Sequence, residues 1–268
     1  MTLPICTVTE GELPLVISIP HGGEFLPESF AQRMTPIARL RADTDWHLRR
    51  LYGFAREQGA SVVEANYSRY VIDVNRPGDG SSLYPGKTTT TLCPVETFRA
   101  EPLYPDGQAP SPDEVEARRR DYWQPYHDAL AAEIARLRQR HANVLVWEAH
   151  SIAGVLPHLF EGRLPELNIG TNSGASCAPS MREAVVAAAA ASAFTWVADD
   201  RFKGGHITRH YGQPDKGVHT IQLEMVQAVY MDERPPFPYL PDAAARVQPV
   251  LRNMLGGALA AMAALPAA

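Results

Sequence analysis

The amino-acid sequence predicts an α/β fold, in which a mixed and mainly parallel sheet is flanked by helices. Short β-branched runs bounded by turn residues alternate with stretches of helical periodicity, as in chains whose strands are joined by crossover helices. Several of these runs are continuously apolar, as expected for strands covered on both faces. The chain has 268 residues, no internal repeat and no linker, so we expect a single domain over residues 1–268.

Five runs have the length and composition of strands. Each is rich in valine, isoleucine or aromatic residues, which fit a pleated and buried surface. The predicted strands are Leu15–Ile19, Ser61–Ala65, Tyr70–Val74, Val144–Trp147 and Val218–Leu223.

Three stretches have helical periodicity. Gly59 is placed to end the first, and Ser111, a residue type common at helix N-caps, precedes the second. Pro125 lies inside the second stretch and should kink it, because proline removes a backbone hydrogen bond. The predicted helices are Asp45–Gln58, Pro112–His141 and Asp242–Ala264.

Two segments, 77–110 and 151–179, show no regular pattern. Loops longer than about 15 residues in a compact domain are usually functional or disordered. The aromatic residues in both segments argue against disorder. We therefore expect these segments to wall a pocket.

The composition argues against several functional classes. Because 25 Lys and Arg stand against 30 Asp and Glu, there is no basic excess to bind nucleic acid. No apolar stretch approaches the roughly 20 residues of a membrane span, and no signal peptide is recognisable. The 3 Cys form no metal or redox motif. We expect a cytoplasmic protein with no nucleic-acid or membrane partner, and the oligomeric state stays open.

Two histidines stand at the ends of predicted strands. His21, in SIPHGGE, follows the first strand, and His150, in LVWEAHS, follows the fourth. Open α/β sheets place ligand crevices at the carboxyl ends of their strands, and imidazole is a common zinc ligand. Glu24 could add an oxygen ligand. For the first motif, a simple His-Gly-Gly turn is the alternative.

A third motif, DTDWH, stands at the start of the first predicted helix. Acidic residues at a helix N-terminus are favoured by capping and by the helix dipole, so a capping role for Asp43 and Asp45 is the simpler interpretation. The functional interpretation makes one of them the carboxylate ligand of a site that two histidines complete.

A fourth motif, SRYVIDVNRP, combines two arginines with an asparagine. In a strand, Arg69 would share a face with Asp73 and Asn75, and Arg76 would follow at the exit. Arginine and asparagine together can bind a carboxylate through paired hydrogen bonds. The alternative is a structural salt bridge from Arg69 or Arg76 to Asp73.

Glu224 ends an otherwise apolar strand. A carboxylate at such a position is either a costly buried charge or a functional one. Beside a water activated by zinc it would be the natural general base. Among the other histidines we expect structural roles for His127, His141 and His158. The roles of His47, His206, His210 and Tyr211 stay open.

Together and in this order, these motifs resemble the N-formylglutamate amidohydrolase (N-formylglutamate deformylase) family. The resemblance covers nearly the whole chain and includes SIPHGG, DTDWHLRRLYGFAREQGAS, YSRYVIDVNRPGDGSSLYPG, LVWEAHSI and ITRHYGQPDKGVHTIQLEMVQAVYM. The family is similar to zinc carboxypeptidases and aspartoacylases. That likeness implies a phosphorylase/hydrolase-like domain with one Zn²⁺ per chain at the carboxyl edge of its sheet.

The resemblance implies a set of metal ligands. His21 and His150 would bind the zinc ion with one carboxylate, either Glu24 or Asp45. Asp45 is favoured over Glu24, because an aspartate recurs at this place in the family.

The resemblance also implies a mechanism and a substrate. Glu224 would be the general base and Arg69 would stabilise the oxyanion, and the residues binding the two substrate carboxylates would be Asn75, Arg76 and Arg209. The implied reaction converts N-formyl-L-glutamate, a small anionic amino-acid derivative, to L-glutamate and formate, a last step of histidine degradation in this family.

Three alternatives stand beside this reading. The first is a related N-acyl-amino-acid hydrolase of the aspartoacylase type. The second is a catalytically silent metal or amino-acid binding protein on the same scaffold. A manganese ureohydrolase is a weaker rival, because its two-metal site needs several Asp-rich motifs and only Asp43 and Asp45 are suggestive.

Overall fold

The computed structural model describes residues 3–83 and 90–266. They form one seven-stranded sheet in the order β1-β3-β2-β4-β7-β5-β6. Two pairs, β1 with β3 and β5 with β7, are antiparallel, and the other neighbours are parallel. The predicted mixed, mainly parallel sheet is confirmed. The strands are β1 (Cys6–Thr9), β2 (Leu15–Ile19), β3 (Ser61–Ala65), β4 (Val144–Ile152), β5 (Leu167–Gly170), β6 (Trp196–Ala198) and β7 (Val218–Val226).

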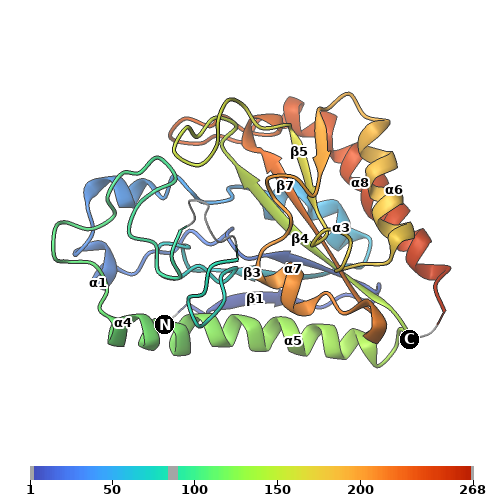
Figure 1. Cartoon of the computed structure of the whole chain (residues 1–268), viewed down its shortest axis with the longest axis horizontal. Helices are drawn as coiled ribbons and strands as arrows, with labels where there is room; N and C mark the ends of the chain where they lie inside the picture. Colours follow the sequence, from blue (N-terminus) through green and yellow to red (C-terminus); the bar gives the residue numbers. More distant parts are fainter. Residues whose placement is uncertain (1–2, 84–89, 267–268) are drawn as a thin grey trace.

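Helices flank both faces of this sheet (Figure 1). On one face, Tyr126 and Leu130 of α5 pack with Val146 of β4. On the other face, α6 and α8 pack together in a core that includes Trp147 and Leu51. The α-helices are α1 (Glu28–Ala31), α2 (Leu48–Leu51), α3 (Gly53–Glu57), α4 (Pro112–Arg118), α5 (Gln124–Arg138), α6 (Pro179–Ala190), α7 (His206–Tyr211) and α8 (Pro241–Ala263). In the described ranges, no helix combines the length and apolar character that crossing a membrane requires.

The two central strands are longer than predicted, and this length shapes the site. β4 continues to Ile152 and β7 continues to Val226, so His150 and Glu224 lie within strands instead of after them. In the parallel register of these strands, His150 is directly opposite Glu224. Paired residues on neighbouring strands point to the same face, so the register alone brings these two side chains together.

The predicted strand at Tyr70–Val74 is wrong. The segment contains turns, and the Val71 N–H donates to the Ser68 carbonyl at 2.9 Å in one of them. Between the turns, the Asp73 N–H donates to the distant Leu92 carbonyl at 2.8 Å. Its apolar residues are nevertheless buried. A loop that packs into a core has the same apolar pattern as a strand, which explains the error.

The helical predictions hold in outline and differ in detail. The first helix is two short ones and begins only at Leu48, because His47 adopts a left-handed backbone conformation. The second begins as predicted, with Ser111 Oγ accepting the Glu114 N–H at 3.3 Å. In place of a simple kink near Pro125, a π-helical turn (η2, Arg119–Trp123) separates α4 from α5. Within the described residues, three strands (β1, β5 and β6) and three α-helices (α1, α6 and α7) were not predicted. One of them, β5, lies in the segment 151–179 that was expected to be irregular.

Candidate active site and metal centre

A cavity opens beside the carboxyl ends of β4 and β7. Its volume is about 90 Å³, which leaves room for several water molecules, because one water takes roughly 10–15 Å³ on the same measure. Both long segments contribute to its lining, as predicted: Thr90 and Phe98 come from 77–110, and Ser151, Ile152 and Leu159 from 151–179. Residues 84–89 of the first segment lie outside the described residues. The cavity suits a small molecule.

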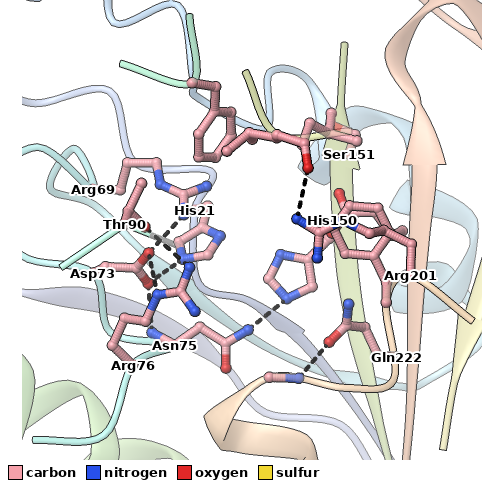
Figure 2. A pocket seen from close by; sticks show the side chains of 16 residues that line it. His21, Arg69, Asp73, Asn75, Arg76, Thr90, His150, Ser151, Arg201 and Gln222 are labelled. Atoms are coloured by element: carbon pink, nitrogen blue, oxygen red, sulfur yellow. Dashed lines mark hydrogen bonds and ion pairs between the residues drawn. The ribbon is translucent and has the colours of Figure 1, made fainter. Parts of the chain in front are cut away.

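Two histidines meet at this cavity (Figure 2). The rings of His21 and His150 have their centroids 4.9 Å apart, and both side chains are buried. Asp45, which does not line the cavity, places its Oδ2 atom 3.8 Å from His21 Nδ1 and 3.1 Å from His150 Nδ1. These three buried residues form a group that could hold a metal ion.

Two further carboxylates, Asp73 and Glu148, bind the Nε2 atoms of the two histidines. His21 Nε2 donates to Asp73 Oδ1 at 2.7 Å, and His150 Nε2 donates to Glu148 Oε1 at 2.7 Å. Although burial would raise the pKa of Asp73, His21 and Arg69 hold this pKa well below its ordinary value. A carboxylate on the far nitrogen fixes the tautomer and orientation of a ligating imidazole. Both Nδ1 atoms are thereby left for the Asp45 side of the rings.

Among the described residues, two buried atoms of this group find no hydrogen-bond partner, namely His21 Nδ1 and Asp45 Oδ1. Buried polar atoms without partners are rare and costly in folded proteins. A divalent cation bound here would satisfy both atoms, and two imidazole nitrogens with one carboxylate are a donor set typical of zinc. The residues present therefore fit the metal that the sequence motifs imply.

The other candidate acidic residues lie elsewhere. The side chain of Glu24 is exposed and is not part of the three-residue group. Asp43 Oδ2 accepts the Phe98 N–H at 2.9 Å, and burial raises the pKa of Asp43 to about 6 despite the nearby Arg69. The capping interpretation of Asp43 and Asp45 is wrong, because α2 has no side-chain cap.

The two histidines differ in their affinity for protons. Burial, assisted by Arg69, lowers the pKa of His21. Burial acts in the same direction on His150, but Asp45 and Glu148 override it and raise the pKa of His150 well above its ordinary value. A ligating imidazole must be unprotonated, so the lowered pKa of His21 favours metal binding and the raised pKa of His150 opposes it.

Three arginines line the cavity from two sides, with Arg69 and Arg76 on one side and Arg201 on the other (Figure 2). Arg69 donates to Asp73 at 2.6 Å, so the salt bridge proposed as the alternative role for this arginine is present. Arg76 donates to Thr90 Oγ1 at 3.0 Å. This concentration of guanidinium groups favours an anionic ligand.

Of the two other predicted substrate-binding residues, Asn75 lines the cavity and Arg209 does not. Asn75 lines the cavity, where its amide nitrogen donates to Glu148 and its amide oxygen accepts the Ile207 N–H at 2.9 Å. Arg209 donates from Nε to the Gly204 carbonyl at 3.1 Å. Among the described residues that line the cavity, Arg201 is present and Arg209 is not. The signal for Arg201 in the sequence was its place in RFKGG, before the Gly-Gly pair that precedes α7.

Glu224 lines the cavity beside His150 and is 8% exposed. Burial raises the pKa of Glu224 to about 8, with His150 acting against the shift and Asp45 adding to it. A carboxyl group with a pKa near working pH can both accept and return a proton during a reaction. This is the behaviour expected of a general acid–base residue.

A comparison with protein families gives an independent result. The family model described as N-formylglutamate amidohydrolase matches residues 13–231 of the chain. The chain belongs to the N-formylglutamate amidohydrolase family. The resemblance drawn from the sequence motifs is confirmed.

Similar proteins agree with membership of the N-formylglutamate amidohydrolase family. The N-formylglutamate deformylase of Pseudomonas aeruginosa is 48% identical over 257 residues, 96% of each chain. That of Pseudomonas putida is 48% identical over 252 residues, 94% of each chain. Among solved structures, an N-formylglutamate amidohydrolase from Ralstonia eutropha (TM-score 0.79, 24% identity, 96% and 97% coverage) shares the fold. A gene product of Agrobacterium tumefaciens (TM-score 0.75, 20% identity, 95% and 94% coverage) shares it too.

The remaining histidines of this N-formylglutamate amidohydrolase family member lie outside the cavity lining. His127 donates from Nε2 to the Val74 carbonyl at 2.8 Å and accepts the Tyr211 hydroxyl at Nδ1 at 2.9 Å, which is the structural role expected of it. His206 and His210 stack on each other, with ring centroids 5.1 Å apart. His47 bonds to a distant carbonyl, as described below.

The raised pKa of Glu224 predicts how the stability of the metal-free protein depends on pH. The ordinary pKa of a glutamate is 4.5, whereas the pKa of Glu224 in the folded protein is about 8. Between these values the folded protein binds more protons than the unfolded chain, so this group makes stability fall as pH rises. Glu224→Gln removes the effect. We therefore compare the Tm of Glu224→Gln with that of wild type, both in chelator. The Tm of the variant minus that of wild type should be several degrees larger at about pH 9 than at about pH 5.

Differential scanning calorimetry of both proteins in chelator would test this. Because both proteins share every other titrating group, the difference between them reports Glu224 together with its coupling to His150. A Tm difference that stays constant across this pH range would contradict the raised pKa.

Proposed function

We propose that this chain hydrolyses N-formyl-L-glutamate to L-glutamate and formate, with one divalent metal, zinc by preference, held by His21, Asp45 and His150. The observation that carries the proposal is the buried group of these three residues beside a cavity lined by arginines. Family membership and the names of the two Pseudomonas relatives support the substrate. We also propose that the reaction is a last step of histidine degradation.

The metal and the protein residues have separate tasks in this proposal. When bound, the metal supplies Lewis acidity, which acidifies a water molecule and polarises a carbonyl group. The chain orients the ligating nitrogens through Asp73 and Glu148, because each carboxylate holds one histidine by its Nε2 atom.

Glu224 moves the proton in the proposed reaction. Its carboxylate takes a proton from the water that attacks the formyl carbon, and it then gives this proton to the leaving amine nitrogen. The C–N bond breaks as glutamate leaves with its amine and the formyl carbon leaves as formate. Arg69 also lines the cavity and stabilises the negative charge that develops on the formyl oxygen.

The arginines bind the two carboxylates of the substrate. Arg76 and Asn75 line one side of the cavity and would bind one carboxylate. We assign the second carboxylate to an arginine of the segment that precedes or forms α7. Two candidates exist there, Arg209 from the sequence motif and Arg201 from the lining of the cavity.

Alanine variants of these two arginines should separate the candidates. The variant that removes the carboxylate-binding arginine is expected to raise KM for N-formyl-L-glutamate about 10-fold to 100-fold, because it removes a charge-assisted contact. The contacts of Arg201 with the cavity favour the larger effect in Arg201→Ala. Steady-state kinetics of both variants would measure this. A larger KM effect in Arg209→Ala would transfer the role to Arg209, and an unchanged KM in both would remove it from this segment.

Gly205 makes the contact between α7 and Asn75 possible. A Cβ atom at Gly205 would overlap the Asn75 side chain, which Glu148 and Ile207 hold in place. We expect Gly205→Ala to displace this amide and lower kcat/KM at least about 10-fold, since misplacement by an ångström can cost that much. Gly53→Ala is the matched control, because a Cβ there meets only open space. Equal kcat/KM in both variants would show that the position of Asn75 is unimportant.

The proposed function itself is tested by formate release. Purified protein would be assayed with N-formyl, N-acetyl and N-succinyl derivatives of glutamate and aspartate, before and after chelation, with elemental analysis of the protein. We expect one metal per chain, preference for N-formyl-L-glutamate, and loss of activity on chelation that added zinc restores. Preference for an acetyl substrate would favour an aspartoacylase type of hydrolase. Stoichiometric binding of N-formyl-L-glutamate without formate release would indicate a silent binding protein.

A further inference from the structure

The backbone immediately after Asp45 adopts an uncommon conformation. His47 has φ 62° and ψ 7°, which is the left-handed region that side chains with a Cβ seldom occupy. Such a conformation persists only where surrounding contacts enforce it. The contacts of His47 therefore influence where the Asp45 carboxylate lies relative to His21 and His150.

One contact joins His47 to a distant part of the chain. His47 Nε2 donates to the Phe237 carbonyl at 2.7 Å. Phe237 is itself in the left-handed region, with φ 58°. Next to this bond, the rings of Trp46 and Phe237 stack with centroids 5.4 Å apart and planes 16° from parallel. His47 and Phe237, two strained residues far apart in sequence, thus share one hydrogen bond, and a ring stack joins Phe237 to the residue before His47.

The backbone carbonyls beside Asp45 are bonded to the same part of the chain. The carbonyl of Thr44 accepts from Gln227 Nε2 at 3.0 Å, and the carbonyl of Trp46 accepts from the Tyr230 hydroxyl at 2.9 Å. The residues before and after Asp45 are therefore anchored to residues 227–237, which follow β7 directly. Because β7 carries Glu224, the segment that holds Asp45 is tied to the strand that carries the proposed general base.

His47 has no direct role in the site. It is outside the group of His21, Asp45 and His150, and it lines a second cavity together with Asp45 and not the one that contains Glu224. Any influence of His47 on the metal must therefore pass through the backbone at positions 45–47.

We infer that His47 is a positioning residue: by donating to the Phe237 carbonyl it fixes the left-handed turn that presents the Asp45 carboxylate to the metal. The inference rests on the metal centre of the proposed function. Loss of the hydrogen bond would release the turn, and the Asp45 carboxylate would no longer be preorganised beside the two histidines.

Zinc affinity, measured without substrate by competition with a chromophoric chelator, tests the inference. We expect His47→Ala to raise the Kd for zinc about 10-fold to 100-fold, as for other residues that support a ligand. His47→Gln keeps an N–H donor on a side chain of similar reach and should restore most of the affinity. His141→Ala is the matched control: His141 also bonds to a backbone carbonyl, that of Glu12 at 2.9 Å, and its loss should leave the Kd unchanged.

Thermal melting of the chelated variants separates positioning from folding. A lower Tm in His47→Ala with an unchanged zinc Kd would assign His47 to stability alone and overturn the inference. An equal loss of affinity in His47→Gln and His47→Ala would overturn the role of the hydrogen bond. Wild-type protein that binds zinc but releases no formate would refute the proposed function and leave the affinity comparison valid, whereas wild type that binds no zinc would overturn both.

Discussion

Glu224→Gln is expected to lower kcat for formate release about 100-fold to 10,000-fold, because an amide cannot accept the proton of the attacking water. The substitution preserves the size of the side chain, and Glu224 is not part of the group of His21, Asp45 and His150. Zinc content should therefore remain at one ion per chain. Single-turnover formate release and metal analysis on the same preparation would measure both quantities.

The control for this variant is Glu133→Gln. Glu133 is also a buried glutamate, but it pairs with Arg136 on α5 and does not line the cavity. Its kcat should stay within about twofold of wild type, as expected for a residue that makes no contact with the reacting groups. Normal turnover by Glu224→Gln would exclude Glu224 as the general base. Loss of zinc from this variant would instead give Glu224 a role in holding the metal.

Asp45→Asn should weaken zinc binding on the order of 100-fold or more and lower activity in parallel, since it removes the charged oxygen of the proposed metal site. Its matched control is Glu24→Gln, which changes the other carboxylate considered as a ligand. Glu24 is exposed and lies outside the group, so its variant should bind zinc like wild type. Chelator competition and formate release would be measured on both proteins.

Two outcomes of that comparison are decisive. Loss of zinc by Glu24→Gln with retention by Asp45→Asn would reverse the ligand assignment. Retention of zinc by both variants would mean that neither carboxylate is required. Excess zinc should restore part of the activity of Asp45→Asn if the defect lies in affinity, because binding follows mass action.

The sequence predicted the centre of the fold better than its edges. β2, β3, β4 and β7 were found because buried parallel strands are continuously apolar. The edge strands β1 and β6 have only four and three residues, too few for a recognisable pattern. The wrong strand at Tyr70–Val74 shows the converse problem, since burial of a loop produces the same apolar composition. A buried strand differs from a buried loop in its backbone pairing with other strands, and amino-acid composition does not record this pairing.

The site could be predicted in part for similar reasons. His21, His150 and Glu224 stood out as polar residues beside apolar strands, a local signal. The choice of Asp45 over Glu24 came from family resemblance, because capping explained an acidic residue there equally well. The hydrogen bond that His21 donates to Asp73 depends on how the loop that contains Asp73 crosses the end of the sheet. No pattern along the chain records such a contact.

The pairing of the central strands also has a consequence for how the protein is made. The β2 and β4 strands, which position His21 and His150, are far apart in sequence, and β7 follows β4 only after β5, β6 and two α-helices, α6 and α7. Contacts between distant strands form after the entropy of closing the intervening loops has been overcome. A chain still emerging from the ribosome therefore lacks the complete group of His21, Asp45 and His150 until β4 has been synthesised and paired, and the Glu224 carboxyl joins later still. We expect metal loading to be a late event in biogenesis, so that unfinished chains neither sequester zinc at this site nor cleave substrate.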